Sequence, residues 1–147
     1  MSAFKTASTL KLKPRTIVWL RNDQRVADNP VLSEALKLGQ PTLCVYCFDP
    51  RHFKQSRYGH LRTDKFRARF LCQSIKDLRT NLRATGSDLL TAWGKPEDVI
   101  SSLLEGVEPG SHVLVQGECT IYEKAVEDRV EAAIRMKAKM TKLLGAT

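Results

Sequence analysis

The sequence predicts one doubly wound α/β domain, a parallel sheet of four to five strands with helices on both faces. Short β-rich apolar runs alternate with segments of helical periodicity along the 147 residues. Strands that alternate with helices pair in parallel, because each helix carries the chain back across the sheet. This length fits a single domain, and no apolar run approaches the roughly 18 to 20 residues that a membrane span needs.

Four strands are expected from apolar and β-branched residues. They are TIVWL (16–20), TLCVYCF (42–48), DLLTA (88–92) and SHVLVQ (111–116). Trp19 and Trp93 are interpreted as packing residues in a strand and at a strand end. Cys44 and Cys47 lie three positions apart in one strand, so they point to opposite faces and are predicted to be buried, reduced thiols.

Four helices are expected around these strands, over residues 30–38, 64–84, 95–105 and 122–140. Asn29 is the predicted N-cap of the first helix and Thr63 that of the second, with Gly39 and Gly86 as their stops. One side of the second helix carries apolar residues at helical spacing and is predicted to pack. Its members are Phe66, Phe70, Ile75, Leu78 and Leu82.

The carboxyl ends of the strands form the predicted functional edge, because open parallel sheets bind ligands there. Loops begin on this edge at Arg21, Asp49, Ala92 and Gly117. The first loop places two cations and two anions directly after an apolar strand, at Arg21, Asp23, Arg25 and Asp28. Two interpretations remain open: these charges pair locally, or the arginines donate to an anionic or polar ligand or to a partner domain.

The net charge of +8 is concentrated between residues 51 and 83, a segment that contains ten basic residues and two acidic ones. Within this segment Arg62, Arg69, Lys76 and Arg83 recur every seven residues and are predicted to form one stripe along the second helix. Such a stripe is either a solvated helix face or a surface for nucleic acid, DNA or RNA, or for an acidic protein.

Recognisable catalytic and metal-binding motifs do not occur in the sequence. No Gly-rich dinucleotide loop, P-loop, nucleophile elbow or HExxH motif is present, and no catalytic residue is predicted. His52, His60 and His112 do not stand at metal-ligand spacing from cysteines or carboxylates, so no metal site is predicted. Residues 1–15 hold four cations and no acid, which is typical of either a disordered tail or a short targeting segment. Two localisations therefore remain open. One is an organelle, either the chloroplast or the mitochondrion, and the other is the cytoplasm or the nucleus.

Several of these segments, in this order, resemble the photolyase/cryptochrome family. VWLRNDQRVADNPVLSEAL is similar to its first strand, Arg-x-Asp-Leu-Arg loop and following helix, with Gln24 where that loop usually has Leu. CVYCFDPRHF, YGHLRTDKFRARFLCQSIKDLRTNLRATGSDLL, GKPEDVISSLL and GECTIYEKAVEDRVEAAI continue the resemblance, and KLLGAT resembles the start of the next strand. FDPRHF and KFRARFL are most similar to the cryptochrome DASH branch.

The resemblance implies that residues 16–147 form the family's N-terminal α/β domain, which is Rossmann-like, carries an antenna cleft and docks on a large helical domain. That helical domain, which holds FAD in the family, has no counterpart in this sequence. No cofactor is therefore expected in this chain alone, while FAD and a folate antenna, methenyltetrahydrofolate, are implied for the full-length family. The cleft residues implied for this chain are Arg21, Asp23, Arg25, Asp49, Glu118 and Glu123.

The resemblance also sets two expectations about activity. Thr120 and Ile121 stand near the positions of the family's Asn/Glu pair for folate, so antenna binding is expected to be weak. The chain is expected to be the antenna and docking domain of a blue-light photoreceptor or DNA photolyase, without flavin photochemistry of its own. Although full-length photolyases are lyases, the resemblance assigns no reaction to this chain alone. The alternative is a stand-alone α/β module that binds a nucleotide-like ligand or nucleic acid.

Overall fold

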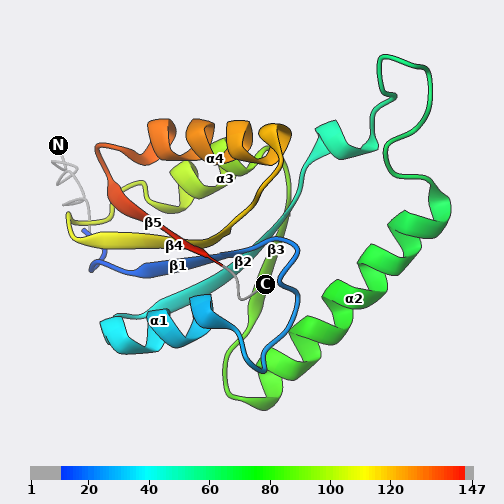
Figure 1. Cartoon of the computed structure of the whole chain (residues 1–147). Coiled ribbons are helices and arrows are strands. Elements are labelled where there is room, and N and C mark those ends of the chain that lie inside the picture. Colours follow the sequence, from blue (N-terminus) through cyan, green and yellow to red (C-terminus); the bar gives the residue numbers. More distant parts are fainter. Residues whose placement is uncertain (1–10, 145–147) are drawn as a thin grey trace, which may run out of the picture.

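A computed structural model describes residues 11–144 of the chain. Five parallel strands form one sheet in the order β3-β2-β1-β4-β5 (Figure 1). The strands are β1 (Thr16–Leu20), β2 (Thr42–Phe48), β3 (Leu89–Trp93), β4 (Ser111–Gly117) and β5 (Ala138–Leu144). The helices are α1 (Pro30–Leu38), α2 (Lys65–Ala84), α3 (Pro96–Leu103) and α4 (Ile121–Ile134), with a short 3-10 helix at Pro50–Phe53. The predicted doubly wound α/β fold is confirmed.

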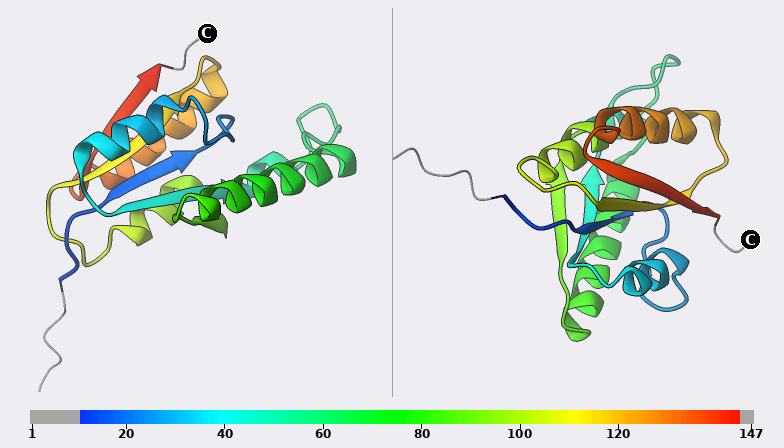
Figure 2. Two further views of the ribbon diagram at one scale, coloured as in Figure 1. Left: turned by 90° about the horizontal axis from the view of Figure 1, so that it is seen from below. Right: turned by 90° about the vertical axis from the view of Figure 1, so that its left-hand side faces the viewer.

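Helices cover both faces of the sheet, α3 and α4 on one side and α1 and α2 on the other (Figure 2). The alternation of side chains along β1 supplies both cores, since Ile17 and Trp19 pack toward α3 and α4 while Val18 and Leu20 pack toward α1 and α2. Cys44 and Cys47 likewise lie in opposite cores as free, buried cysteines, as predicted.

The boundaries of α1 follow the predicted capping residues. The Asn29 side chain accepts hydrogen bonds from the backbone N–H groups of Val31 and Leu32, which would otherwise lack partners at the helix start. At the other end Gly39 adopts a left-handed conformation with φ of 62°, which a residue without Cβ takes at no steric cost. The helix thus begins and ends where the sequence indicates.

The last predicted helix is too long. α4 ends at Ile134, and residues 138–144 form β5, which pairs in parallel with β4 from Ser111↔Ala138 to Gly117↔Leu144. Lys and Met in this segment are good helix formers, which is why the pattern favoured a helix. The hydrogen-bonding edge of β4 overrides that propensity, because pairing satisfies the backbone groups of both strands.

The start and the packing of α2 also differ from the prediction. Asp64, not Thr63, is the N-cap, since its side chain accepts from the Lys65 N–H. The second half of α2 buries Ile75, Leu78 and Leu82 against the sheet, and Leu71 packs at the border of this core. The predicted packing residues of the first half, Phe66 and Phe70, are 73% and 69% exposed. Figures 1 and 2 show the reason: this half of α2 extends beyond the sheet.

The part of the N-terminal segment that the structure describes is attached to the domain. Leu12 bridges to Val107, donating to the Gly106 carbonyl and accepting from the Glu108 N–H. Arg15 donates its N–H to the Ser111 hydroxyl oxygen. Residues 1–10, which carry most of the predicted tail or targeting segment, lie outside the described residues.

Candidate functional site: a cleft at the carboxyl edge of the sheet

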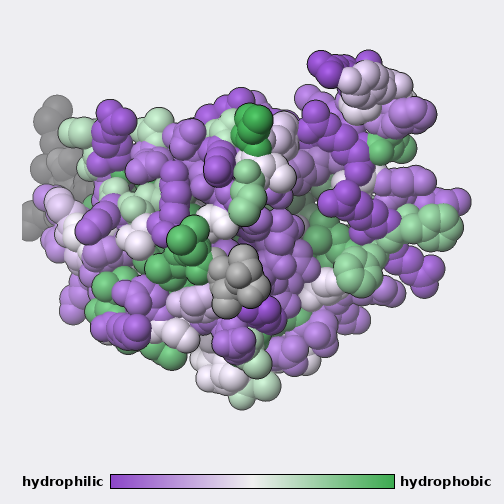
Figure 3. All heavy atoms as spheres, viewed as in Figure 1, coloured by the Kyte–Doolittle hydropathy of each residue, from purple (hydrophilic) through white to green (hydrophobic). Residues whose placement is uncertain are grey.

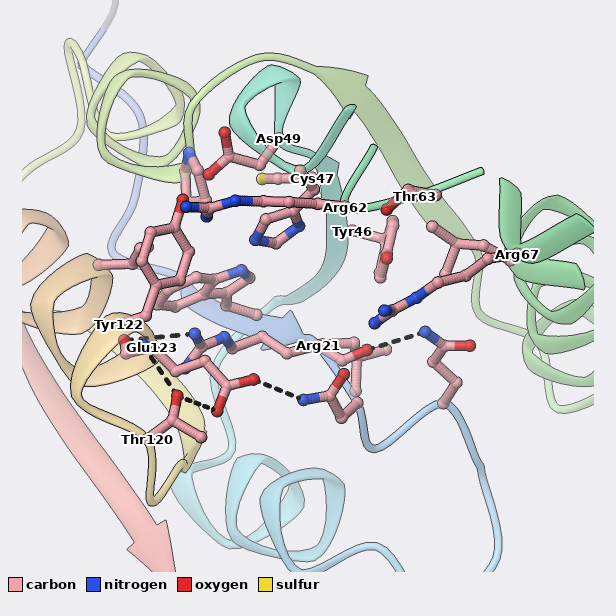
Figure 4. A pocket seen from close by; sticks show the side chains of 18 of the residues that line it. Arg21, Tyr46, Cys47, Asp49, Arg62, Thr63, Arg67, Thr120, Tyr122 and Glu123 are labelled. Carbon is pink, nitrogen blue, oxygen red and sulfur yellow. Dashed lines mark hydrogen bonds between the residues drawn. The ribbon is translucent and has the colours of Figure 1, made fainter. Parts of the chain in front are cut away.

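A cleft of about 580 Å³ lies at the carboxyl ends of β1, β2 and β4, the edge predicted to bind ligands (Figure 4). Its walls come from the loops after these strands, the start of α4 and the first half of α2. The volume falls within the range of roughly 300–1,000 Å³ that small-molecule sites occupy. The topology therefore places a ligand-sized hollow where the strand order reverses at β1.

Aromatic rings and arginines alternate along the cleft. The Arg21 guanidinium lies 4.7 Å from the centroid of the buried Trp19 ring, and that of Arg62 lies 4.6 Å from the Tyr122 ring. His52 also lies near Tyr122, with 6.1 Å between ring centroids. Burial lowers the pKa of His52, and the charges of Arg21, Arg51 and Arg62 lower it further against the opposing effect of Asp49. The neutral imidazole is thus favoured in the cleft.

Arg21 is held by a carboxylate far away in the sequence. Its Nη1 donates to Glu127 Oε1 at 2.7 Å, and Nη2 donates to the Glu123 carbonyl at 3.3 Å. Glu127 is 3% exposed and also accepts from the Glu118 N–H, so its charge is both paired and hydrogen-bonded. The interpretation in which the charges of this loop pair with one another is wrong for Arg21.

The other charges of this loop face its own backbone. Asp23 accepts from the Arg21 N–H, and Arg25 Nε donates to the carbonyl oxygen of Asp28. Asn29 donates to the carbonyls of Asp23 and Arg25, which fixes the turn that leads into α1. The charged loop is therefore a local scaffold, and of its four charged residues only Arg21 lines the cleft.

A second ion cluster fixes the loop after β2. Arg51 donates to both oxygens of Asp49 and, through its two Nη atoms, to both oxygens of Glu97 at 2.9 and 3.0 Å. Burial alone would raise the pKa of Asp49, but the hydrogen bonds and charge of Arg51 hold this pKa below its usual value. The same bonds raise the pKa of Arg51. The cluster joins the end of β2 to the start of α3.

The polar mouth of the cleft centres on Asn22. Its amide nitrogen donates to Glu118 at 3.0 Å and to Glu123 at 3.2 Å, although these residues are about one hundred positions away. Thr120 caps α4, accepting from the Glu123 N–H and donating its hydroxyl to Glu123 Oε2 at 2.8 Å. The result is a small group of hydrogen-bonding oxygens opposite Arg62 and Arg67 (Figure 4).

Only some of the predicted cleft residues meet in the cleft. Arg21, Asp49 and Glu123 line it, and Glu118 is joined to Glu123 through Asn22. Asp23 and Arg25 do not line it. Metal chemistry gains no support, since the described residues 11–144 contain no group of three or more His, Cys, Asp or Glu side chains arranged to hold an ion.

The predicted basic stripe is shorter than the heptad spacing implies. Arg62 precedes α2 and lies against Tyr122 in the cleft. Arg83 is neutralised by Asp88, with 3.0 Å between Arg83 Nε and Asp88 Oδ1. Arg69 and Lys76 form no ion pair with any other residue of the described 11–144. Trp93 differs as well: it stacks against Phe53 at the strand end but remains 65% exposed.

Four residues that shape the cleft were missed from the sequence: Asn22, Arg67, Tyr122 and Glu127. Glu127 did leave a signal, because a carboxylate between Val126 and Val130 on the buried face of α4 requires a buried partner. The others left none, since loop and helix-start residues converge only once the strand order is known.

The order 3-2-1-4-5, with a cleft at the strand reversal, defines a doubly wound α/β domain, a class in which ligands bind at this edge of the sheet. Within that class the DNA photolyase family model matches residues 16–146, so the chain belongs to this family. Over 118 residues it is 45% identical to "Cryptochrome DASH" of Gloeobacter violaceus, an alignment that covers 80% of this chain and 23% of the relative.

Solved structures show the same relationship. A cryptochrome of Synechocystis superimposes with a TM-score of 0.80 at 33% identity, over 89% of this chain and 28% of that one. An archaeal photolyase of Sulfolobus tokodaii, solved with two FAD molecules, shares the fold with a TM-score of 0.76 at 23% identity, over 88% of this chain and 29% of that one. The chain thus spans about a quarter of the length of these relatives. None of the helices between residues 11 and 144 is long and apolar enough to cross a membrane.

Proposed function

We propose that this chain is the antenna and docking domain of a cryptochrome DASH-like blue-light photoreceptor or DNA photolyase. The observation that carries the proposal is the cleft at the carboxyl edge, which combines ring faces, a hydrogen-bonding mouth and an exposed apolar rim. Family membership supports the proposal, because the relatives are about four times as long as this chain. Their additional length leaves room for the FAD-binding helical domain that the proposal requires.

The cleft residues fit a flat heteroaromatic antenna. Phe70 and Tyr122 offer ring faces on its border, and Glu123 offers a carboxylate that accepts from an amino or ring N–H group. Such a chromophore would absorb light and pass its energy to a flavin. This chain's residues bind and orient the antenna, and Arg62 and Arg67 face any anionic part of it.

Folate is expected to bind weakly to this chain alone. Ile121 stands where the family places a polar folate contact, and it is 88% exposed with no hydrogen-bonding group. Glu123, which replaces that contact in our proposal, already accepts from Asn22 and Thr120. We expect binding of methenyltetrahydrofolate weaker than micromolar in a fluorescence titration, and a tighter value would contradict the expectation that Ile121 weakens folate binding, not the antenna role of the cleft.

The rim of the cleft is the proposed docking surface for an FAD-binding helical domain. Its apolar side chains come from α2, the end of β3 and the start of α4, yet all lie at the same edge of the sheet. They are Phe70 (69% exposed), Trp93 (65%), Ile121 (88%) and Tyr122 (37%). Apolar side chains exposed at one edge of the sheet support this role, because exposed apolar surface marks interaction sites. In this proposal the helical partner domain binds FAD and this chain does not. The purified chain is therefore expected to show no flavin absorption band.

A domain replacement tests the proposal. Residues 16–144 of this chain replace the matching segment of the Gloeobacter violaceus relative, and the chimera is measured for FAD content and blue-light flavin photoreduction. We expect both to be retained. Failure to retain FAD, in a chimera that is soluble and whose parent retains it, would contradict the docking role.

Matched double variants locate the docking surface in the chimera. Trp93→Lys/Ile121→Lys places two charges on the rim and is expected to release FAD or prevent domain association. Leu36→Lys/Met136→Lys changes two apolar residues that are more exposed and lie away from the cleft, and it is expected to have no effect. Equal effects of the two doubles would argue for a stand-alone module, because the rim would then have no special role.

A further inference from the structure

Three of the side chains that line the cleft are rings that lose electrons readily: Trp19, Tyr46 and Tyr122. A chromophore that has absorbed light accepts an electron more readily than it does in the dark. An indole or phenol ring in contact with it can therefore donate one electron, which ends the excited state before its energy reaches another group. The cleft must limit this reaction if it holds an antenna.

An arginine lies over each of two of these rings. The Arg62 guanidinium is 4.6 Å from the centroid of the Tyr122 ring (Figure 4), and that of Arg21 is 4.7 Å from the centroid of the Trp19 ring. Both distances are typical of cation–π contacts. A ring that loses an electron becomes positively charged, and the charge of the guanidinium repels this new charge. Each arginine thus makes oxidation of the ring beneath it less favourable.

The two arginines differ in what surrounds them. Arg62 forms no ion pair with any residue of the described range 11–144, so nothing there offsets the effect of its charge on Tyr122. Arg21 is fixed more firmly, because its Nη1 donates to Glu127 Oε1 at 2.7 Å and both side chains are largely buried. The carboxylate of Glu127 offsets part of the positive charge. We therefore expect the stronger effect from Arg62.

The third ring is protected differently. Tyr46 is 8% exposed, and burial raises the pKa of its hydroxyl group to about 12. The phenol therefore keeps its proton, and a protonated phenol is harder to oxidise than a phenolate. All three oxidisable rings of the cleft thus lie in surroundings that oppose the loss of an electron.

Cation–ring contacts also occur outside the cleft, but on an open surface. Arg57 lies over Tyr58 and Lys65 over Phe66, at 4.7 and 5.1 Å from the ring centroids. These two rings are 71% and 73% exposed. Figure 3 shows apolar side chains lying separately among hydrophilic ones over the first half of α2. Water and salt screen contacts of this kind, so the argument applies only to the pairs in the cleft.

We propose that Arg62 and Arg21 suppress electron transfer from Tyr122 and Trp19 to an excited chromophore in the cleft. In the suppressed step one electron leaves the ring and is taken up by the excited chromophore, the ring becomes a radical cation, and no bond forms or breaks. The energy of the excited state then remains available for transfer to a flavin. This inference rests on the antenna role proposed above and assigns a specific task to two arginines of the cleft.

The test attaches a chromophore covalently to the full chain, so that the result does not depend on the affinity of a free antenna. Cys72→Ser leaves Cys119 as the exposed cysteine, and Cys119 stands next to Thr120 on the cleft wall. A maleimide-linked isoalloxazine with a short linker is attached to Cys119, and its fluorescence lifetime is measured. Arg62→Gln is expected to shorten this lifetime by about two-fold or more. Arg62→Gln/Tyr122→Phe is expected to restore it, because a phenylalanine ring does not donate the electron.

A matched control removes the same charge at the same edge of the sheet. Arg25 is exposed like Arg62 but does not line the cleft, and Arg25→Gln is expected to leave the lifetime unchanged. Arg21→Gln/Glu127→Gln removes the second arginine together with its buried partner and is expected to shorten the lifetime less than Arg62→Gln does. Circular dichroism confirms that each variant is folded, and the exposed position of Arg62 keeps the main comparison independent of the core.

Three results would overturn the proposal. They are an unchanged lifetime in Arg62→Gln, a shortened lifetime that persists after Tyr122→Phe, and an equal shortening in Arg25→Gln. Failure of the chimera described above would contradict the docking role but would leave these lifetimes unchanged, so the two proposals fail separately.

Discussion

The two halves of α2 carry similar charge and similar numbers of apolar residues, yet they differ in what covers them. Ile75, Leu78 and Leu82 in the second half are at most 4% exposed, whereas Phe66 and Phe70 in the first half are about 70% exposed. Helical periodicity identifies which residues share a face, but it does not say whether a sheet lies opposite that face. The second half of α2 (75–84), here called the anchored half, thus stabilises the fold. The first half (65–74), the projecting half, contributes little to the core.

The segment that leads into the projecting half is itself firmly held at its base. Arg51 ties the loop after β2 to Asp49, which is 2% exposed, and to Glu97 on α3. The chain from residue 54 onward therefore extends from a loop that these ion pairs hold in place. The stability of the domain should depend on the anchored half and on Arg51, and hardly at all on the outer side of residues 54–70.

The largest expected effect is in the anchored half. Leu78→Ala removes a side chain that is 1% exposed in the core between α2 and the sheet, and it should lower the free energy of unfolding by about 3 to 5 kcal/mol. Urea unfolding followed by circular dichroism measures this loss. A loss below about 1 kcal/mol would mean that α2 is not anchored here.

A somewhat smaller effect is expected at the loop from which residues 54–70 extend. Arg51→Met leaves the buried Asp49 carboxylate without its cation and should cost about 3 kcal/mol at pH 7. The double variant Arg51→Met/Asp49→Asn should recover part of this loss, because it removes the unpaired charge. If the single variant is as stable as the wild type, the cluster does not hold the loop.

Much of the fold was predictable because it rests on local signals. Asn29, Pro30 and Gly39 fixed α1, and runs of apolar residues fixed β1 and β2 at the observed boundaries. The residue pattern assigned the start of β5 to a helix, because its lysines and Met140 favour one, and only the free edge of β4 makes a strand of this segment. A fifth strand was indicated only by the resemblance of KLLGAT to the family's next strand. Interactions between distant segments decide such elements, and a single sequence does not display them.

The candidate site was predictable only in its location. The carboxyl edge followed from the alternation of strands and helices, and Arg21, Asp49 and Glu123 followed from the resemblance. The partners of these residues did not, because Arg21 pairs with Glu127 over 106 positions and Asn22 reaches Glu123 over 101. Of the two interpretations left open for the charged loop, local pairing does not hold for Arg21, because its guanidinium pairs with the buried carboxylate of Glu127.

A small effect is expected at the far end of the anchored half. Asp88 accepts from Arg83 first and also from the Leu89 N–H and Arg79, which lowers its pKa from 3.8 to about 2. A depressed carboxylate pKa adds stability above about pH 4, and this stability is lost as the pH falls toward 2. Because the site is solvent-exposed, Asp88→Asn should lower the thermal midpoint only slightly at pH 7. The curves of variant and wild type should converge near pH 2, and a constant gap down to that pH would contradict the assignment.

The smallest effect on stability is expected in the projecting half, where Phe66→Ala provides the sharpest contrast with Leu78→Ala. Phe66 is 73% exposed, and the Lys65 ammonium group lies over its ring. Removal of this ring should therefore change the free energy of unfolding by less than about 0.5 kcal/mol. A loss of stability comparable to that of Leu78→Ala would show that both halves of α2 belong to one core.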